Sequence, residues 1–358
     1  MKKTIALILA LVMCLCLFAA CGSNEAPADT SAPADTSKPA DTSKPADVPQ
    51  AANPVVLKLA HGLKADSIMG MAIQQFANEV TDATEGRVSF QIFPNGQLGS
   101  LATVIEAVDL GEIAISMSDI SLITETVPQL NLLALPMIVK DFDGWKALVN
   151  SEVGEELANI LAENSNMYMM GYVFNGFREV IVKKDIQSLE DCTGIILRSP
   201  EADIYVQTFQ RMNFTPTPLD AGEVYNGLNA GVVEGADTSF EGFWNNSYYE
   251  VATRIIESNH MAATMTIIMN QEIWDTIPAE DQAIVAEVYD RVFDQCSEDV
   301  YAASMGFKDK LLEAGCTIYQ YTAEEQAVLV ERFQTYWDEA AAQHGFEDLL
   351  AQAIEIRG

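Results

Sequence analysis

Hydrophobic and polar residues alternate along the chain with two different periods. Residues 55–60 and 88–92 place apolar side chains at every second position, which is the period of a half-buried β-strand. Between them, residues 67–84 carry apolar side chains at three- and four-residue spacing, which predicts an amphipathic helix. A Pro94-Asn95-Gly96 turn ends the second strand. The folded part therefore begins as strand, helix, strand.

The same two periods predict further elements in the middle of the chain. We expect helices at 101–110 and 142–163, and strands at 113–117, 167–174 and 178–182. Alternating strands and helices are typical of an α/β fold, for which we expect largely parallel sheets. From Pro278 onward the helical period dominates, with one strand-like break at 317–321. The pattern indicates α/β lobes closed by long C-terminal helices.

The first twenty residues differ from the rest of the chain. Lys2 and Lys3 precede a short apolar run, which predicts a secretory signal peptide over residues 1–20. The run is shorter than the about 20 residues that a transmembrane helix needs. Phe18-Ala19-Ala20 before Cys21 resembles a bacterial lipobox, although Leu, Val or Ile is more usual than Phe18. Cys21 is thus predicted to carry a diacylglycerol anchor; the alternative is an ordinary signal peptide cut elsewhere.

Residues 21–53 are predicted to tether the folded part to this anchor. The sequence Pro-Ala-Asp-Thr-Ser begins at Pro27, Pro33 and Pro39 and fades at Pro45. A repeat of Pro, Ala, Asp, Thr and Ser has no apolar surface to bury, so we expect a disordered, solvated segment.

The composition excludes several classes of protein. Of the 358 residues, 49% are hydrophobic, which suffices for two packed domains and argues against disorder for most of the chain. The 20 Lys and Arg against 52 Asp and Glu give a net charge of −32. Nucleic acid is therefore not expected as a partner, because phosphate binding needs a basic surface. The single long apolar run, at the start, excludes a multi-span membrane protein.

The cysteines leave two arrangements open. After the leader and the predicted lipid site, Cys192, Cys296 and Cys316 remain. Outside the cytoplasm, a Cys296–Cys316 disulfide and three unpaired thiols are both possible. The sequence contains no Cys-x-x-Cys pair, so a zinc ribbon is unsupported.

Motifs of catalysis and metal binding are missing from the sequence. His61, His260 and His344 lie far apart and have no neighbouring cysteine, so we expect no histidine-based metal site. The GxSxG, GxxxxGK[ST] and HExxH patterns do not occur. We therefore predict neither an enzyme nor a cofactor.

An ordered series of short motifs extends over residues 55–350. The series includes a Gly-Arg-Val strand with a turn ending in Gln-Leu-Gly, a Leu-Pro, a Gly-x-Arg and an Arg-x-Pro; its members lie at 86–99, 133–136, 176–178, 189–200, 223–225, 231–235 and 259–260. Each motif alone is unspecific, but the ordered set resembles the solute-binding subunit of TRAP (tripartite ATP-independent periplasmic) transporters, the DctP-type receptors.

The resemblance implies an α/β, two-lobed, periplasmic-binding-protein-like fold with hinge strands and long C-terminal helices. The motifs place one lobe at 54–175 plus 264–303 and the other at 176–263 plus 304–358. A ligand would lie in the cleft between the lobes. The closed complex would then dock on a small and a large TRAP membrane subunit, which use a sodium or proton gradient for uptake.

Three charged residues are implied to lie in this cleft. Arg198, the Arg-x-Pro arginine, would make a two-pronged salt bridge to a ligand carboxylate, because a rigid guanidinium fork matches a carboxylate. The alternative for Arg198 is an ion pair with one of the many acids. Arg178, the Gly-x-Arg arginine, would be a second cationic contact, with Glu179 as a competing partner. Asp119 would bind ligand hydroxyls or an amine, or only cap the following helix.

Other candidate positions concern the shape of the pocket. Thr238 and Ala221 stand where many relatives have Asn and an aromatic residue. Both are smaller, so we expect a larger or reshaped pocket, which puts sialic acid or simple C4-dicarboxylate specificity in doubt. Phe174, Phe240 and Trp244 are candidates for aromatic walls of the pocket or for core positions.

The sequence thus predicts an extracytoplasmic receptor for a small organic anion, lipid-anchored to the outer face of the cell membrane. The alternatives are an ABC-type solute receptor, and a surface enzyme or adhesion module on a binding-protein fold, since a fold does not fix a function. An arginine fork specifies a carboxylate and leaves the rest of the ligand, a co-bound cation and the oligomeric state open.

Overall fold

The computed structural model describes residues 54–358. The predicted signal peptide, the lipid site Cys21 and the repeat-rich tether lie outside the described residues. Within residues 54–358, every helix is too short or too polar to span a lipid bilayer. Cys192, Cys296 and Cys316 are all buried and unpaired, so of the two predicted cysteine arrangements the structure has three separate thiols.

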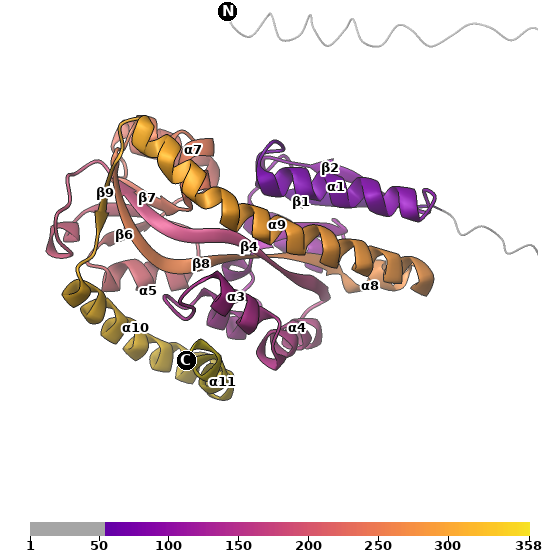
Figure 1. The fold of residues 1–358 in the computed structure, drawn as a ribbon. Helices are drawn as coiled ribbons and strands as arrows, with labels where there is room; N and C mark the ends of the chain where they lie inside the picture. Colours follow the sequence, from indigo (N-terminus) through magenta and orange to yellow (C-terminus); the bar gives the residue numbers. More distant parts are fainter. Residues whose placement is uncertain (1–53) are drawn as a thin grey trace, which may run out of the picture. The chain divides into compact units, whose positions relative to one another are not determined.

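The strands of residues 54–358 form one sheet of nine strands. They are β1 (Val55–His61), β2 (Val88–Phe93), β3 (Ile115–Asp119), β4 (Met167–Val182), β5 (Ile196–Ser199), β6 (Thr215–Pro218), β7 (Gly235–Thr238), β8 (Arg254–Asn270) and β9 (Thr317–Gln320). The strand order is β2-β1-β3-β8-β4-β7-β5-β6, with β9 paired to β8. The long strands β4 and β8 therefore occupy the middle of the sheet and join its two halves (Figure 1).

The sheet is mixed, which refines the prediction of largely parallel sheets. In one half β1 pairs in parallel with β2 and β3, and in the other β5 pairs in parallel with β6 and β7. The central pair β4–β8 is antiparallel, as are β3–β8 and β4–β7. The antiparallel pairs arise because the chain passes from the first half to the second along β4 and returns along β8.

The helices pack around this sheet (Figure 1). They are α1 (Ile68–Ala83), α2 (Leu101–Asp109), α3 (Phe142–Val149), α4 (Glu152–Asn164), α5 (Asp203–Arg211), α6 (Val224–Ala230), α7 (Phe240–Asn245), α8 (Gln271–Asp275), α9 (Ala279–Glu313), α10 (Ala323–His344) and α11 (Glu347–Arg357). The 35-residue α9 crosses β4, and it contacts α1 from the first half of the sheet and α7 from the second. Thus α9, like β4 and β8, belongs to both halves.

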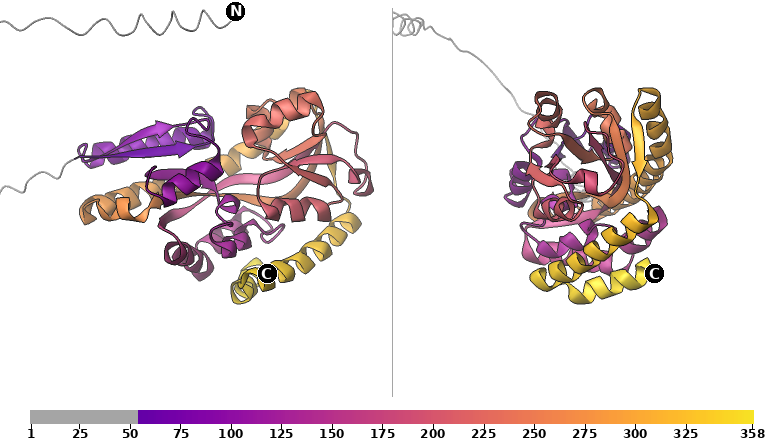
Figure 2. Two further views of the ribbon diagram at one scale, coloured as in Figure 1. Left: turned by 180° about the vertical axis from the view of Figure 1, so that it is seen from behind. Right: turned by 90° about the vertical axis from the view of Figure 1, so that its left-hand side faces the viewer.

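The C-terminal helices also contact both halves. Helix α10 packs against α5, where Arg211 pairs with Glu339 at 2.5 Å. On the other side, Trp337 donates an indole hydrogen bond of 2.8 Å to the Pro136 carbonyl, and α11 packs against α3. Figure 2 shows α10 and α11 next to each other in both views. The exact lobe boundaries stay a prediction.

Two predicted elements differ from the structure. The helix predicted at 142–163 is two helices, because the chain leaves α3 at Asn150 and Ser151 begins α4 by accepting a hydrogen bond from the Val153 N–H. The strands predicted at 167–174 and 178–182 are one strand, β4, which continues through bulges around Gly176. Gly176 has a φ of +90°, a conformation that glycine adopts without steric cost.

A larger bulge lies where β8 passes the second half of β4. Arg178 pairs with Met261 and Val180 with Ile256, so two steps along β4 correspond to five along β8. The three extra residues make β8 bend outward between these pairs, and Asn259 in the bulge has a φ of +45°. We call residues 257–260 the β8 bulge.

Candidate functional site

A cavity of about 550 Å³ lies between the two halves of the sheet. Its walls come from the loop that joins β1 to α1, the loops before α2 and after β3, and strands β4, β5 and β7 together with α7. Of the candidates from the sequence, Arg198, Arg178, Asp119, Thr238 and Ala221 line it. Five positions far apart in the sequence are thus brought to one place.

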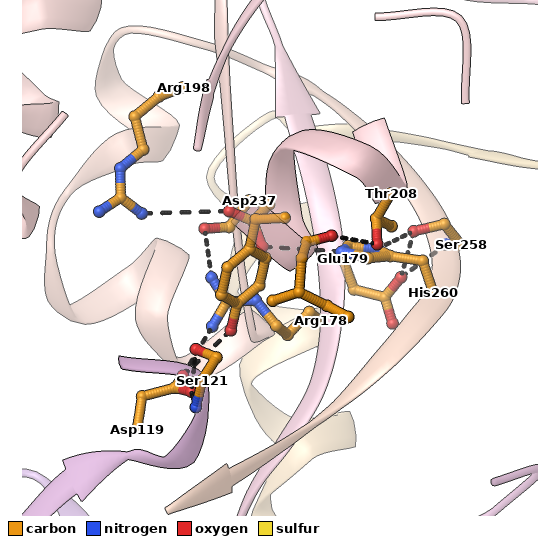
Figure 3. Close-up of polar contacts among 11 residues, drawn as sticks. Asp119, Ser121, Arg178, Glu179, Arg198, Thr208, Asp237, Ser258 and His260 are labelled. Carbon is orange, nitrogen blue, oxygen red and sulfur yellow. Dashed lines mark hydrogen bonds and ion pairs between the residues drawn. The ribbon is translucent and has the colours of Figure 1, made fainter. Parts of the chain in front are cut away.

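Arg198 on β5 points to the cavity with an almost unpartnered guanidinium (Figure 3). Its side chain is 9% exposed, and its Nη1 lies 4.0 Å from the Asp237 carboxylate. Among residues 54–358, its one hydrogen bond runs from Nε to the Leu219 carbonyl, at 2.9 Å. Burial lowers the pKa of Arg198, which Asp237 only partly offsets. The two terminal nitrogens therefore form a poorly solvated, positively charged fork that makes no hydrogen bond within residues 54–358, with Asp237 as the nearest carboxylate.

Arg178 on β4 is buried in the same cavity wall and lies between two carboxylates. Its Nε donates to Asp237 Oδ2 at 2.5 Å and its Nη2 to the Asp237 carbonyl at 3.2 Å. Its Nη1 lies 3.8 Å from Asp119 Oδ2, and the guanidinium sits over the Tyr205 ring at 4.8 Å. Burial opposes its charge, but the Asp237 carboxylate raises the pKa of Arg178 above its ordinary value. The competing partner expected for Arg178, Glu179, is not the one it contacts.

Asp237 holds the two arginines together (Figure 3). It lies on β7, its side chain is completely buried, and it faces Arg178 on one side and Arg198 on the other. Burial alone would raise the pKa of this carboxyl, but the charge and hydrogen bond of Arg178 together with nearby His260 keep the pKa well below its ordinary value. Asp237 is therefore an anion at neutral pH, and it was not among the residues identified from the sequence.

Asp119 caps a helix, which is one of the two alternatives raised by the sequence, and it also lines the cavity. Its Oδ1 accepts from the Ser121 N–H at 3.0 Å and from the Ser121 hydroxyl at 2.6 Å, at the start of a 3₁₀ turn (Ile120–Leu122). Its Oδ2 accepts from the Tyr205 hydroxyl at 3.1 Å. Asp119 comes from the first half of the sheet and Tyr205 from α5 next to the second, so this bond links the two halves.

The three candidate aromatic walls do not line the cavity. Phe174 packs in the core against Phe142, with ring centroids 4.9 Å apart, and its neighbour Asn175 lines the cavity instead. Phe240 is buried, and Trp244 stacks on Tyr249. The reason is geometric: adjacent strand residues face opposite ways, and α7 turns its aromatic side chains to the core while Glu241 and Asn245 line the cavity.

A chain of polar contacts leads from Asp237 into the β8 bulge (Figure 3). His260 Nε2 lies 3.6 Å from Asp237 Oδ2, and His260 Nδ1 is hydrogen-bonded to the Ser258 hydroxyl at 2.8 Å. The buried Glu179 carboxylate accepts from the Ser258 N–H at 2.6 Å and from the Asn259 N–H at 2.9 Å. Glu179 thus satisfies the two backbone donors that the bulge removes from the β4–β8 ladder.

Glu179 predicts a pH dependence of stability. Burial raises the pKa of its carboxyl from 4.5 to about 8, against the opposing Asn259 and Ser258 N–H groups; Glu257 raises the pKa further and Lys308 lowers it. Because the folded chain then binds more protons than the unfolded chain, this group's contribution to stability falls as the pH rises between the two values. Glu179→Gln is expected to remove that fall.

The measurement is the thermal midpoint of the Glu179→Gln variant and of the parent protein across this pH range. The difference between the two midpoints should move in favour of the variant as the pH rises. A difference that stays constant over the range would show that Glu179 titrates alike in the folded and the unfolded chain. Other groups titrate equally in both proteins and cancel in the difference.

Metal binding finds no support in the described part of the chain. Within residues 54–358 no three His, Cys, Asp or Glu side chains gather closely enough to hold a metal ion. The acids of the cavity are instead paired with arginines or bonded to backbone N–H groups.

Known proteins similar to this chain are solute-binding proteins. Residues 59–344 match the family described as bacterial extracellular solute-binding protein, family 7 (DctP). A solute-binding protein of Chromohalobacter salexigens is 28% identical over 290 residues, which cover 80% of this chain and 84% of that protein.

Solved structures have the same fold. A TRAP periplasmic solute-binding protein from Chromohalobacter salexigens with bound D-glucuronate is 24% identical, with a TM-score of 0.80 over 84% of this chain and 99% of that one. A TRAP periplasmic solute-binding protein from Sulfurospirillum deleyianum with bound succinate is 25% identical, with a TM-score of 0.77 over 83% and 97%. These matches confirm the predicted two-lobed, periplasmic-binding-protein-like α/β fold.

Proposed function

We infer the function of this chain from its family, because it belongs to the DctP family, family 7 of the bacterial extracellular solute-binding proteins. We propose that its solute is a small organic acid, and that the carboxylate of this acid binds Arg198 in the cavity. The observation that carries the proposal is the Arg198 guanidinium, buried at the cavity wall with two terminal nitrogens that make no hydrogen bond within residues 54–358.

A carboxylate matches this site better than other anions of similar size. Two parallel N–H···O bonds from a planar guanidinium fit the two oxygens of a carboxylate, and such charge-assisted bonds are about twice as strong as neutral ones. Part of the desolvation cost of binding is also already met in the protein without solute, since Arg198 is buried next to Asp237. D-glucuronate and succinate, bound in the two similar structures, both carry carboxylates.

The remaining parts of the proposal concern delivery. As a receptor without catalytic activity, the protein would hand its solute to the small and large membrane subunits of a TRAP transporter, which use an ion gradient for uptake. Lipidation at Cys21 would hold it on the outer face of the cell membrane, with residues 22–53 as the tether. Family membership supports an extracytoplasmic location and a receptor role.

The proposal is tested by a thermal-shift screen of the mature chain carrying Cys21→Ser. The panel contains monocarboxylates, dicarboxylates, keto acids, sugar acids and neutral sugars. An acid present at about 100 times its Kd should stabilise the protein by about 2.7 kcal/mol, which raises the midpoint by several degrees. If no acid shifts the midpoint of the folded protein and a neutral compound does, the carboxylate proposal is wrong.

A further inference from the structure

The charges around the cavity do not favour a strongly anionic solute. Three cations line it, Lys64, Arg178 and Arg198, against four acids, Asp119, Asp220, Asp237 and Glu241. The lining therefore has a formal charge of −1 before any solute binds. Family membership does not decide the matter, because one similar structure holds a monoacid and another a diacid.

Two of the three cations have little capacity for a second carboxylate. Arg178 lies between Asp237 and Asp119, and its Nε and Nη2 both donate to Asp237. The amino group of Lys64, which is exposed, donates to the Asn245 carbonyl on the other side of the cavity. Arg198 is thus the one buried cation of this lining whose terminal nitrogens face the cavity without a hydrogen bond in residues 54–358.

Two of the four acids make no ion pair within residues 54–358. Asp220 accepts from the Gly222 N–H at 2.8 Å. Glu241 accepts from the Asn245 amide at 3.1 Å and from the Ile68 N–H at 3.4 Å. Asp220 therefore places a negative charge at the cavity wall without a paired cation. Glu241 does so in its ionised form; burial raises the pKa of its carboxyl, and the charge of Lys310 partly offsets that effect. A second carboxylate on the solute would be repelled by both.

The uncharged part of the lining offers hydroxyl and amide groups. It includes the side chains of Ser67, Asn95, Ser100, Asn175, Ser239 and Tyr248. Groups of this kind donate and accept hydrogen bonds, as the hydroxyl groups of a polyhydroxylated solute do. Ser67, Ser100 and Ser239 already cap helices α1, α2 and α7. The groups that depend on the solute are therefore those of Asn95, Asn175 and Tyr248, and an alkyl chain next to them would leave them without partners once water is excluded, which is costly.

We propose that the solute carries one carboxylate, bound by Arg198, and is otherwise uncharged and hydroxylated, and that Asp220 and Glu241 exclude a second carboxylate. This inference rests on the proposed function, since it assumes a solute acid at Arg198. It assigns Asp220 and Glu241 a role in specificity. They lower the affinity for a diacid solute without contacting the carboxylate that the monoacid and the diacid have in common.

The test uses pairs of acids that differ in one carboxylate. Gluconate and glucarate have the same carbon chain and the same four internal hydroxyl groups, as do galactonate and galactarate. Butyrate and succinate form a pair without hydroxyl groups. The Kd of each acid for the mature chain with Cys21→Ser is measured by calorimetry. We expect a hydroxylated monoacid to bind at least about tenfold more tightly than its diacid and than butyrate.

The outcomes separate the inference from the function. A diacid that binds as tightly as its monoacid, or more tightly, overturns the inference and leaves the receptor proposal intact. Butyrate or succinate as the tightest ligand also overturns it. Failure of every acid to bind overturns the inference together with the carboxylate proposal on which it rests.

Two variants test the role of the acids directly. Asp220→Asn and Glu241→Gln keep an oxygen that can accept the same backbone hydrogen bonds but remove the charge. In the double variant the ratio of the diacid Kd to the monoacid Kd should fall about tenfold. Glu313→Gln is the matched control, because Glu313 is exposed at the end of α9, and it should leave the ratio unchanged. An unchanged ratio in the double variant would show that the two acids do not set the discrimination.

Discussion

Arg198→Ala is expected to raise the Kd for the solute acid by about 30-fold to several thousand-fold. The range corresponds to the about 2–5 kcal/mol lost when one member of a buried, hydrogen-bonded charge pair is removed. The Kd of Arg198→Lys should lie between that of Arg198→Ala and that of the parent protein, because the ammonium keeps the charge but not the two-pronged geometry. The measurement is calorimetry with the tightest acid from the screen.

The same variant should leave the protein without solute nearly as stable as the parent. Arg198 is buried, burial opposes its charge, and its nearest carboxylate oxygen is 4.0 Å away. Arg198 is therefore expected to contribute little to the free energy of unfolding and to act mainly in solute binding. Unchanged affinity in a folded Arg198→Ala protein would contradict the proposed carboxylate contact. Lost affinity together with a much lower thermal midpoint would show a structural role instead.

Asp237→Ala is expected to lower the free energy of unfolding by about 3–5 kcal/mol, the range seen when one partner of a buried ion pair is removed. The substitution leaves Arg178 and Arg198 close together in a buried wall without the carboxylate that both face. Urea unfolding at neutral pH measures the loss. A change below about 1 kcal/mol would show that water or Asp119 already screens the two arginines.

Two further variants make this prediction specific. Asp237→Asn keeps the shape and should lose most of the same stability, because the charge is what the arginines require. Combining Asp237→Ala with Arg178→Met removes both partners and should recover part of the loss. Because the pKa of Asp237 is depressed in the folded protein, its contribution to stability is present at neutral pH and declines as the pH falls through the acid range.

The sequence predicted the elements whose pattern is local. The alternation in β1 and β2 and the helical spacing in α1 are set by one buried face each, so the period identifies them. The boundary between α3 and α4 was missed because Asn150 and Ser151 interrupt the helix without changing its apolar spacing. The two predicted pieces of β4 are one strand because bulges, which pairing with β8 stabilises, interrupt its pattern.

For the site, a motif located Arg198 and Arg178, but their partners depend on tertiary structure. Asp237 sits in the four-residue strand β7, and no local pattern shows that arginines from β4 and β5 meet it there. Asp237 is the one charged residue in a strand of small, uncharged residues, and this is the local feature that could have identified it. Of the two positions open to the aromatic candidates, they take the core one, because the pleat of β4 and the face of α7 decide which neighbour points to the cavity.

The threefold crossing of the chain between the two halves of the sheet constrains how this receptor can change during evolution. Segments β4, β8 and α9 each belong to both halves, so neither half is a continuous stretch of sequence. Recombination at a single junction would sever one of these shared segments, and swapping one half for that of a relative would need several simultaneous exchanges. New solute preferences are therefore expected to arise by substitutions in place around the cavity, while the scaffold is inherited whole.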